Sequence, residues 1–153
     1  AFNFAPAEAE GIIREQWQSL QAIWPDKKII IEGSAHIRCD ENWLGEAFLN
    51  LLKNACEHTS DEGVIRVQLE RTEAAFFCII EDNGGGVAPE ELPKLFQRFY
   101  RAQHQNKNGA GIGLAIVKEI IQRHHGNIVA ENGKHGLRMT ISMPMLDRNL
   151  TNS

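Results

Sequence analysis

A short stretch with alternating glycines constrains the fold of this chain more than any other. Gly109, Gly111 and Gly113 give way directly to an apolar run that reaches Ile121. Glycine tolerates positive φ angles and lets the backbone come close to a ligand. A helix that begins after such a turn directs its unpaired N–H groups and the positive end of its dipole outward. The stretch therefore predicts either an anion site, most often for phosphate, or only a tight connection.

The segment from 40 to 59 has the clearest helical pattern, and Asp40 or Asn42 can cap it. One face is apolar and is predicted to be buried, with Leu44, Phe48, Leu51 and Ala55 at helical spacing. The opposite face carries Glu46, Asn50, Asn54 and His58, spaced four residues apart. Asparagine competes for backbone hydrogen bonds and is a poor choice in a helix interior. The two asparagines are thus either solvated filler or a row of amide oxygens for a metal or a polar ligand.

Further helices and strands complete the pattern. Helices are predicted over 7–23 and over 112–125, the latter ending at Gly126, and a short helix or turn over 89–95. Strands are predicted at 1–6, 28–32, 36–39, 63–70, 74–81, 127–131 and 137–143. This order of elements predicts an α+β sandwich, with the helices on one face of a mixed sheet.

The strand at 74–81 leads into a second candidate site. It is predicted to form a hairpin with the strand before it, and because it is nearly all apolar, it is predicted to be central and buried on both faces. Asp82 follows it, and Gly84 to Gly86 come next. An aspartate at the end of a buried strand is well placed to bind a ligand, although Asp and Gly also favour a simple Asx-type turn.

Composition narrows the function. The content of 42% hydrophobic and 24% charged residues is typical of one soluble domain with a sizeable core. No apolar run is long enough to span a bilayer, and the first residues do not resemble a signal peptide. The net charge of −4 argues against nucleic-acid binding. Cys39, Cys56 and Cys78 are scattered, which indicates reduced thiols rather than a zinc site.

Four segments together resemble the catalytic, ATP-binding (HATPase) domain of bacterial two-component sensor histidine kinases, in the superfamily that also includes gyrase, the Hsp90 chaperone and MutL. The resemblance covers nearly the whole chain. Its motifs are NLLKNACEHT (50–59), EDNGGGVAPE (81–90), LFQRFYR (95–101) and NGAGIGLAIVKEI (108–120). The chain has no G-x-x-x-x-G-K-[ST] segment, which points away from P-loop proteins.

The resemblance implies a specific architecture. We expect a two-layer α/β sandwich of the Bergerat ATP-binding type, with a mixed, mostly antiparallel sheet and about three helices on one face. Residues 1–146 would form this domain, and 147–153 would be a C-terminal tail. The polar segment 102–108, between aromatic residues and the glycine turn, would belong to a mobile ATP lid that spans 87–108.

The resemblance also assigns roles to residues of the first two motifs. Asn54 matches the asparagine that holds Mg²⁺, and Asn50 would bind the phosphates or a water on the metal. His58 lies where the family often has a tyrosine or histidine beside the nucleotide. Asp82 matches the aspartate that accepts a hydrogen bond from the adenine amino group. The backbone at Gly84 and Gly86 would approach the base.

The other two motifs would supply the lid and the phosphate site. Phe96 and Phe99 would anchor the lid, and Arg101 matches an arginine that reaches the γ-phosphate, so that Arg101 would act in catalysis with the two asparagines of the first motif. The hinge and phosphate cradle would consist of Gly109, Gly111 and Gly113, and Leu114 would begin the helix behind them.

Three positions depart from the family pattern. Glu57 stands where relatives commonly carry a phosphate-binding lysine, and Lys53 lies at a different angle of the helix. Ala110 replaces a frequent threonine in the last glycine motif, so a hydroxyl is missing. Leu137 follows Gly136 where a threonine is common, which predicts a more apolar adenine pocket.

Three functions compete: a histidine kinase, a superfamily ATPase that drives conformational change, and a non-catalytic nucleotide-binding module. In the ATPases a glutamate one turn before the metal-binding asparagine activates water. That position here is Asn50, and a neutral amide is a poor general base, so phosphotransfer is favoured over hydrolysis. A silent module would have lost its glycines or Asn54, and these are present.

No segment resembles the family's phosphoacceptor motif, H-E-[LF]-[RK]-[TN]-P. We therefore expect a cytoplasmic catalytic fragment, monomeric by itself, of a longer homodimeric kinase anchored in the bacterial inner membrane. Its partners would be the dimerisation and histidine phosphotransfer helices of its own full-length chain, and a response regulator that receives the phosphate. Its cofactors would be ATP and Mg²⁺.

Overall fold

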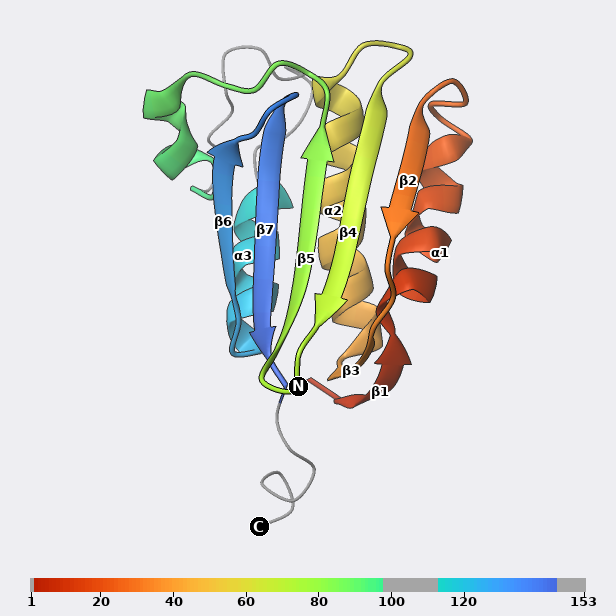
Figure 1. The fold of residues 1–153 in the computed structure, drawn as a ribbon, viewed down its shortest axis with the longest axis vertical. Helices are drawn as coiled ribbons and strands as arrows, with labels where there is room; N and C mark the ends of the chain where they lie inside the picture. The colour runs from red at the N-terminus through yellow and green to blue at the C-terminus, as the bar shows by residue number, and fades with distance from the viewer. Residues whose placement is uncertain (1, 98–112, 146–153) are drawn as a thin grey trace.

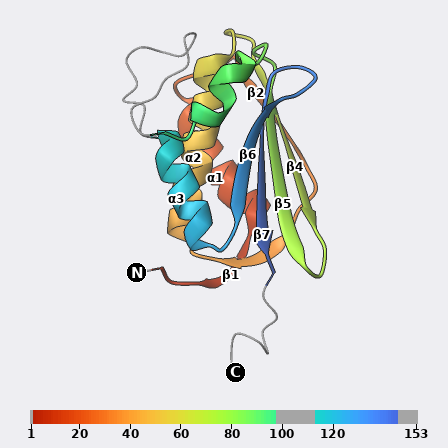
Figure 2. The ribbon, with the colours of Figure 1, turned by 90° about the vertical axis from the view of Figure 1, so that its left-hand side faces the viewer.

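The computed structural model describes residues 2–97 and 113–145, and these residues form two layers. One layer is a five-stranded sheet, and the helices α1, α2 and α3 cover one of its faces, as Figure 2 shows from the side. The predicted α+β sandwich is thereby confirmed. The predicted lid segment 102–108 and the tail 147–153 lie outside the described residues.

The five-stranded sheet is mixed and mostly antiparallel, as expected. Its order is β2-β4-β5-β7-β6, in which only β2 and β4 pair in parallel, while the other neighbours are antiparallel (Figure 1). The strand bounds are Lys28–Glu32 for β2, Val64–Arg71 for β4, Ala75–Asp82 for β5, Asn127–Asn132 for β6 and Leu137–Pro144 for β7. These bounds lie within one or two residues of those predicted from the sequence.

A second, smaller sheet joins β1 (Ala5–Glu8) to β3 (His36–Cys39) in antiparallel register. The N-terminal strand was expected over 1–6, so it begins later than predicted and α1 (Ala9–Gln21) begins later as well. The bounds of β1 are set by its pairing with β3, which lies about 30 residues further along the chain. No local pattern in the N-terminal segment indicates this pairing.

β5 is central, as predicted, but the prediction that it is buried on both faces was wrong. Phe76, Cys78 and Ile80 point toward the helices and are buried, whereas Phe77 and Ile79 are only half-buried on the open face. Antiparallel sheets commonly leave one face open to water. The apolar run in β5 therefore overstates how much of the strand is covered.

The helix α2 (Glu41–His58) packs its apolar face on the sheet, and the four predicted stripe residues Leu44, Phe48, Leu51 and Ala55 are buried. Asp40 is its N-cap: Oδ1 accepts from the Trp43 amide at 3.0 Å, and Oδ2 accepts from the Asn3 amide at 2.6 Å. Burial alone would raise the pKa of Asp40, but these amide donors and the nearby His124 outweigh it, and the pKa is lowered. The Asp40 carboxylate therefore stays ionised, and its negative charge stabilises the positive end of the helix dipole.

The C-terminal end of α2 is capped by a buried lysine, a contact that was not predicted from the sequence. Lys27 is only 3% exposed, and its Nζ donates to the Thr59 carbonyl at 3.1 Å, to Thr59 Oγ1 at 3.0 Å and to the Ser60 carbonyl. A cation at this end complements the helix dipole and satisfies carbonyls that have no partner within the helix. Lys27 thus fixes the end of the helix that carries His58.

The helix α3 (Gly113–Arg123) ends differently from the prediction. The residue with positive φ is His125 (64°) and not Gly126. The His125 and Gly126 amides donate to the carbonyls of Gln122 and Ile121, both at 2.9 Å, which is a Schellman motif with Gly126 one position later than expected. Gly126 is needed for another reason: a Cβ there would collide with the Ser142 carbonyl oxygen of β7.

None of the helices in the described parts of the chain is long and apolar enough to cross a membrane. The three cysteines are free and buried, and burial raises the pKa of Cys39 and Cys78 to about 12 and that of Cys56 to about 11. Their thiols are therefore poor nucleophiles near neutral pH.

Candidate functional site

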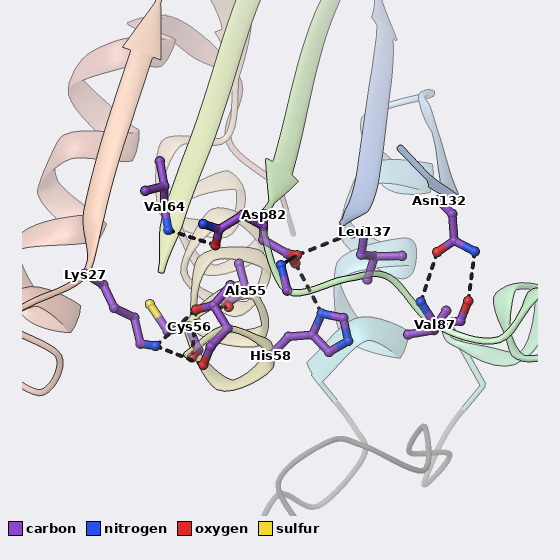
Figure 3. Close-up of polar contacts among 12 residues, drawn as sticks. Lys27, Ala55, Cys56, His58, Val64, Asp82, Val87, Asn132 and Leu137 are labelled. Carbon is purple, nitrogen blue, oxygen red and sulfur yellow. Dashed lines mark hydrogen bonds and ion pairs between the residues drawn. The ribbon is translucent and has the colours of Figure 1, made fainter. Parts of the chain in front are cut away.

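The predicted site residues that the structure describes gather at one end of the molecule, at the top of Figure 1. The C-terminal end of α2, the end of β5, the turn between β6 and β7 and the beginning of α3 meet there. Figure 3 shows the polar contacts that join the first three of these segments.

Asp82 is the last residue of β5, and its side chain is 3% exposed. Its Oδ1 accepts from the Gly84 amide at 2.9 Å and from the Leu137 amide at 3.3 Å. The bond to Gly84 is the Asx-type turn that was the simpler alternative for this position. It occupies only one oxygen, however, so the turn and a ligand-binding role are compatible.

The second carboxylate oxygen of Asp82 lies close to His58. Asp82 Oδ2 and His58 Nδ1 are 3.4 Å apart, and both side chains are 3% exposed. This separation is long for a hydrogen bond. His58 is therefore the partner of Oδ2 among the described residues, and this contact is longer than either contact of Oδ1.

The glycines after Asp82 allow this loop to fit between its neighbours. A Cβ on Gly84 would collide with the His58 carbonyl oxygen, and a Cβ on Gly86 would collide with Asn132 Oδ1. Gly86 also has a φ of 79°, which favours glycine. The structure thus requires glycine at both positions because of close contacts within the protein.

The asparagine row on α2 reaches the beginning of α3. Asn50 and Asn54 are half-buried and lie one turn apart on the same face. Asn50 Nδ2 donates to the Glu46 carbonyl at 2.9 Å, and Asn50 Oδ1 lies 3.0 Å from the position that a Cβ on Gly113 would take. The first residue of α3 is therefore packed against the polar face of α2, and Leu114 follows, half-buried.

Several predicted site residues are not placed. Phe99, Arg101, Gly109 and Gly111 lie outside the described residues. Phe96 is described and half-buried, and Lys118 Nζ of α3 lies 5.8 Å from the centroid of its ring. That spacing is within the range of a cation–π contact, so the ring of Phe96 lies beside α3.

The three departures from the family pattern have structural counterparts where they are described. Glu57 is half-buried, and burial raises its pKa, an effect that nearby Lys53 opposes. Leu137 is 1% exposed, so its side chain belongs to the core beside Asp82. Ala110 lies outside the described residues.

One residue of the site escaped sequence reasoning: Asn132 binds the backbone of Val87. Gly136 was expected at the adenine pocket, and the structure shows that it lets the backbone of the β6–β7 turn touch Asp82. The Asn-Gly pair at 132–133 signals a turn, but nothing in the local sequence indicates what the turn would contact.

Comparison with known proteins defines the class. Residues 39–147 match the family described as "Histidine kinase-, DNA gyrase B-, and HSP90-like ATPase". The probable sensor kinase SilS of Salmonella typhimurium is 38% identical over 112 residues, which cover 71% of this chain and 22% of SilS. The structure of the mycobacterial sensor histidine kinase MprB is 26% identical, with a TM-score of 0.85 over 92% of this chain and 98% of that one.

A further structural neighbour is the histidine kinase ThkA in complex with the response regulator protein TrrA. It is 21% identical with a TM-score of 0.76, and the match covers 94% of this chain and 42% of that one. The likeness to ThkA shows the shared fold. The chain spans about a fifth of the length of the curated relatives it matches, 22% in the case of SilS.

The family match and the fold are those of an ATP-binding domain. The chain belongs to the histidine kinase-, DNA gyrase B- and HSP90-like ATPase family, and it is homologous to the catalytic, ATP-binding domain of two-component sensor kinases. The resemblance drawn from the four sequence motifs is thereby confirmed.

Proposed function

We propose that this chain transfers the γ-phosphoryl group of Mg-ATP to a histidine on helices that lie elsewhere in a longer protein. The observation that carries the proposal is the position of Asn50. An amide and not a carboxylate stands one turn before Asn54, beside the first residue of α3, and the Glu46 carboxylate lies a further turn back, with Oε1 3.5 Å from Asn50 Nδ2. A neutral amide does not activate water well, so this arrangement supports transfer over hydrolysis.

The two asparagines are suited to a hard cation. Mg²⁺ prefers oxygen ligands and is usually held by one or two protein groups, with phosphates and water completing its shell. The amide oxygen of Asn54 would bind the metal, and Asn50 would bind a phosphate or a water on the metal. When bound, Mg²⁺ neutralises charge on the phosphates. The protein's part is to hold these two amides in register on one face of α2.

The base would be read by Asp82. Its Oδ1 is engaged by two backbone amides, so Oδ2 would accept from the adenine amino group, beside His58. Guanine carries a carbonyl oxygen in place of this amino group. That oxygen cannot donate a hydrogen bond to the Asp82 carboxylate, so guanine would be disfavoured. Gly84 and Gly86 would line the same side of the base.

The residues outside the described ranges complete the proposal by resemblance alone. Arg101 would offset charge at the γ-phosphate, and Phe99 would anchor the lid together with Phe96. Gly109 and Gly111, with Gly113 of α3, would form the hinge and the phosphate cradle.

The partners and the setting are also proposals. The phosphoacceptor helices would belong to the same full-length, homodimeric chain, and a response regulator would take the phosphate, in line with the complex of ThkA with TrrA. The catalytic domain would extend over 1–146 and would lie in the cytoplasm, while the full-length protein would be anchored in the inner membrane.

Asp82→Asn is expected to weaken adenine selectivity. The asparagine keeps an oxygen for the Gly84 and Leu137 amides but replaces Oδ2 with a donor. We expect ATP affinity to fall roughly 10- to 100-fold, the cost of a hydrogen bond to a charged group, with little change for GTP. Titration calorimetry with both nucleotides measures this ratio. Asp26→Asn, an exposed position before β2, controls for the change in net charge, and an equal loss of ATP and GTP binding would count against base reading.

The phosphotransfer itself is tested with γ-labelled ATP, this chain and a histidine-containing helical hairpin from its own full-length protein. We expect acid-labile label on the hairpin, and none on a hairpin whose phosphoacceptor histidine is replaced. Release of labelled phosphate without label on the hairpin would favour the ATPase instead. Nucleotide binding with neither product would identify a silent nucleotide-binding module.

A further inference from the structure

The side chain of Asn132, at the end of β6, binds both backbone polar groups of one distant residue. Its Oδ1 accepts from the Val87 amide at 2.9 Å, and its Nδ2 donates to the Val87 carbonyl at 2.8 Å, as Figure 3 shows. The amide thus pairs with Val87 as a neighbouring strand would. Val87 is buried, with 7% exposure, so the contact fixes the point where the glycine loop ends in the core.

Other contacts fasten the same two segments together. The Gly85 amide donates to the His135 carbonyl at 3.2 Å, and the His135 amide donates to Glu81 Oε2 at 3.1 Å. The Leu137 amide donates to Asp82 Oδ1 at 3.3 Å. The β6–β7 turn is therefore joined to the loop over 81–87 at both ends and in the middle.

The loop needs such support because of its composition. Three consecutive glycines, Gly84 to Gly86, carry more backbone freedom than any other residue type and lose more of it when they become ordered. Gly85 and Gly86 have φ angles of 89° and 79°. A Cβ on Gly86 would also collide with Asn132 Oδ1, so the loop and the asparagine fit each other closely.

We propose that Asn132 is a positioning residue for adenine recognition, which it serves through Val87 without touching the nucleotide. Its amide holds the glycine loop in the shape that places Gly84 and Gly86 beside the base, next to Asp82. This inference rests on the proposed function, because the loop is taken to be the wall of the adenine pocket. The turn that already carries Gly136 and Leu137 would then also support the first glycine motif through Asn132.

A positioning role and a purely structural role have different consequences. If Asn132 only stabilises the fold, its loss lowers the folded fraction and weakens ATP and GTP binding equally. If Asn132 orders the adenine pocket, its loss weakens ATP binding and leaves the weaker binding of GTP nearly unchanged. The ratio of the two affinities therefore separates the two roles.

The test compares Asn132→Ala with Thr72→Ala in the 153-residue chain. Thr72 is a matched control at the opposite end of β5: it is also exposed, and its Oγ1 accepts from the Ala74 and Ala75 amides at 3.1 and 3.0 Å. Asn132→Ala removes two bonds between a side chain and the backbone, and Thr72→Ala removes three, because Thr72 Oγ1 also donates to the Ala75 carbonyl at 3.4 Å. We expect comparable falls in Tm, but a roughly three- to tenfold loss of ATP affinity only in Asn132→Ala, with a matching fall in the ATP-to-GTP ratio.

A second variant guards against a failure to fold. Asn132→Asp keeps the acceptor for the Val87 amide and places an acceptor against the Val87 carbonyl, so the ratio is expected to fall in the same direction. An unchanged ratio in these variants, or the same ratio change in Thr72→Ala, would overturn the positioning role. A wild-type chain that does not bind ATP would instead overturn the proposed function, and this inference with it.

Discussion

Replacing Asn54 with alanine is expected to abolish Mg-dependent binding of ATP. Loss of groups that only support a metal ligand commonly costs 10- to 100-fold in metal affinity, so loss of the ligand itself is expected to cost at least about 100-fold. The wild-type chain should bind ATP much more weakly when Mg²⁺ is removed with a chelator. The Asn54→Ala chain should show the same weak affinity with and without the metal in titration calorimetry.

Asn42→Ala is the matched control for this variant. Asn42 lies in the first turn of the same helix and is exposed, so the same substitution is made at the far end from the site. It should leave both ATP affinity and its dependence on Mg²⁺ unchanged. If Asn54→Ala binds Mg-ATP as tightly as the control does, the metal site proposed for α2 is wrong.

Gly136→Ala is expected to abolish ATP binding by displacing the loop that carries Asp82. A Cβ on Gly136 would lie 2.5 Å from the Asp82 carbonyl oxygen and 2.8 Å from the Gly84 nitrogen, and it would overlap with Asp82 Oδ1. Two of these atoms belong to the backbone, so the loop itself must move. We expect a loss of roughly 1–3 kcal/mol in the free energy of unfolding, the usual cost of overpacking, together with loss of detectable ATP binding.

Gly11→Ala is the matched control: it makes the same substitution, and it is expected to stabilise the fold instead of destabilising it. Gly11 lies in α1, is exposed, and has no atom within 4 Å of an added Cβ. Alanine should therefore stabilise the helix by roughly 0.5–1 kcal/mol and leave ATP binding intact. Urea unfolding and nucleotide titration of both variants measure the two effects. Gly136→Ala protein that unfolds and binds ATP like the Gly11→Ala protein would show that the turn does not constrain Asp82.

The elements that the sequence predicts well are those whose cause is local. The apolar stripe of α2 follows the helical period, and its cap is a residue type that caps helices, so both the helix and Asp40 are found from a few neighbouring residues. The same holds for β2 and β3, whose bounds match the prediction, because alternation and turn residues define them. The four sequence motifs likewise identify the family because each is continuous in the chain.

The features that were missed depend on contacts between distant segments. The open face beside Phe77 depends on where the helices pack, and β5 alone carries no sign of it. Lys27 and Asn132 each bind backbone groups far away in the sequence, at Thr59 and at Val87. A lysine in a charged turn or an asparagine before a glycine has the same local pattern whether or not such a partner exists.

The bonds that shape the pocket join positions far apart in the chain. Leu137 and Asp82 are separated by 55 residues, and Asn132 and Val87 by 45. Bringing such distant positions together costs loop-closure entropy, which the pairing of β7 with β5 must offset. No shorter segment that lacks β6 and β7 contains the pocket, even if it carries the asparagine row and the first glycine motif. The proposed nucleotide site is therefore a property of the complete sheet, because it needs β7 paired beside β5 and β6 paired beside β7.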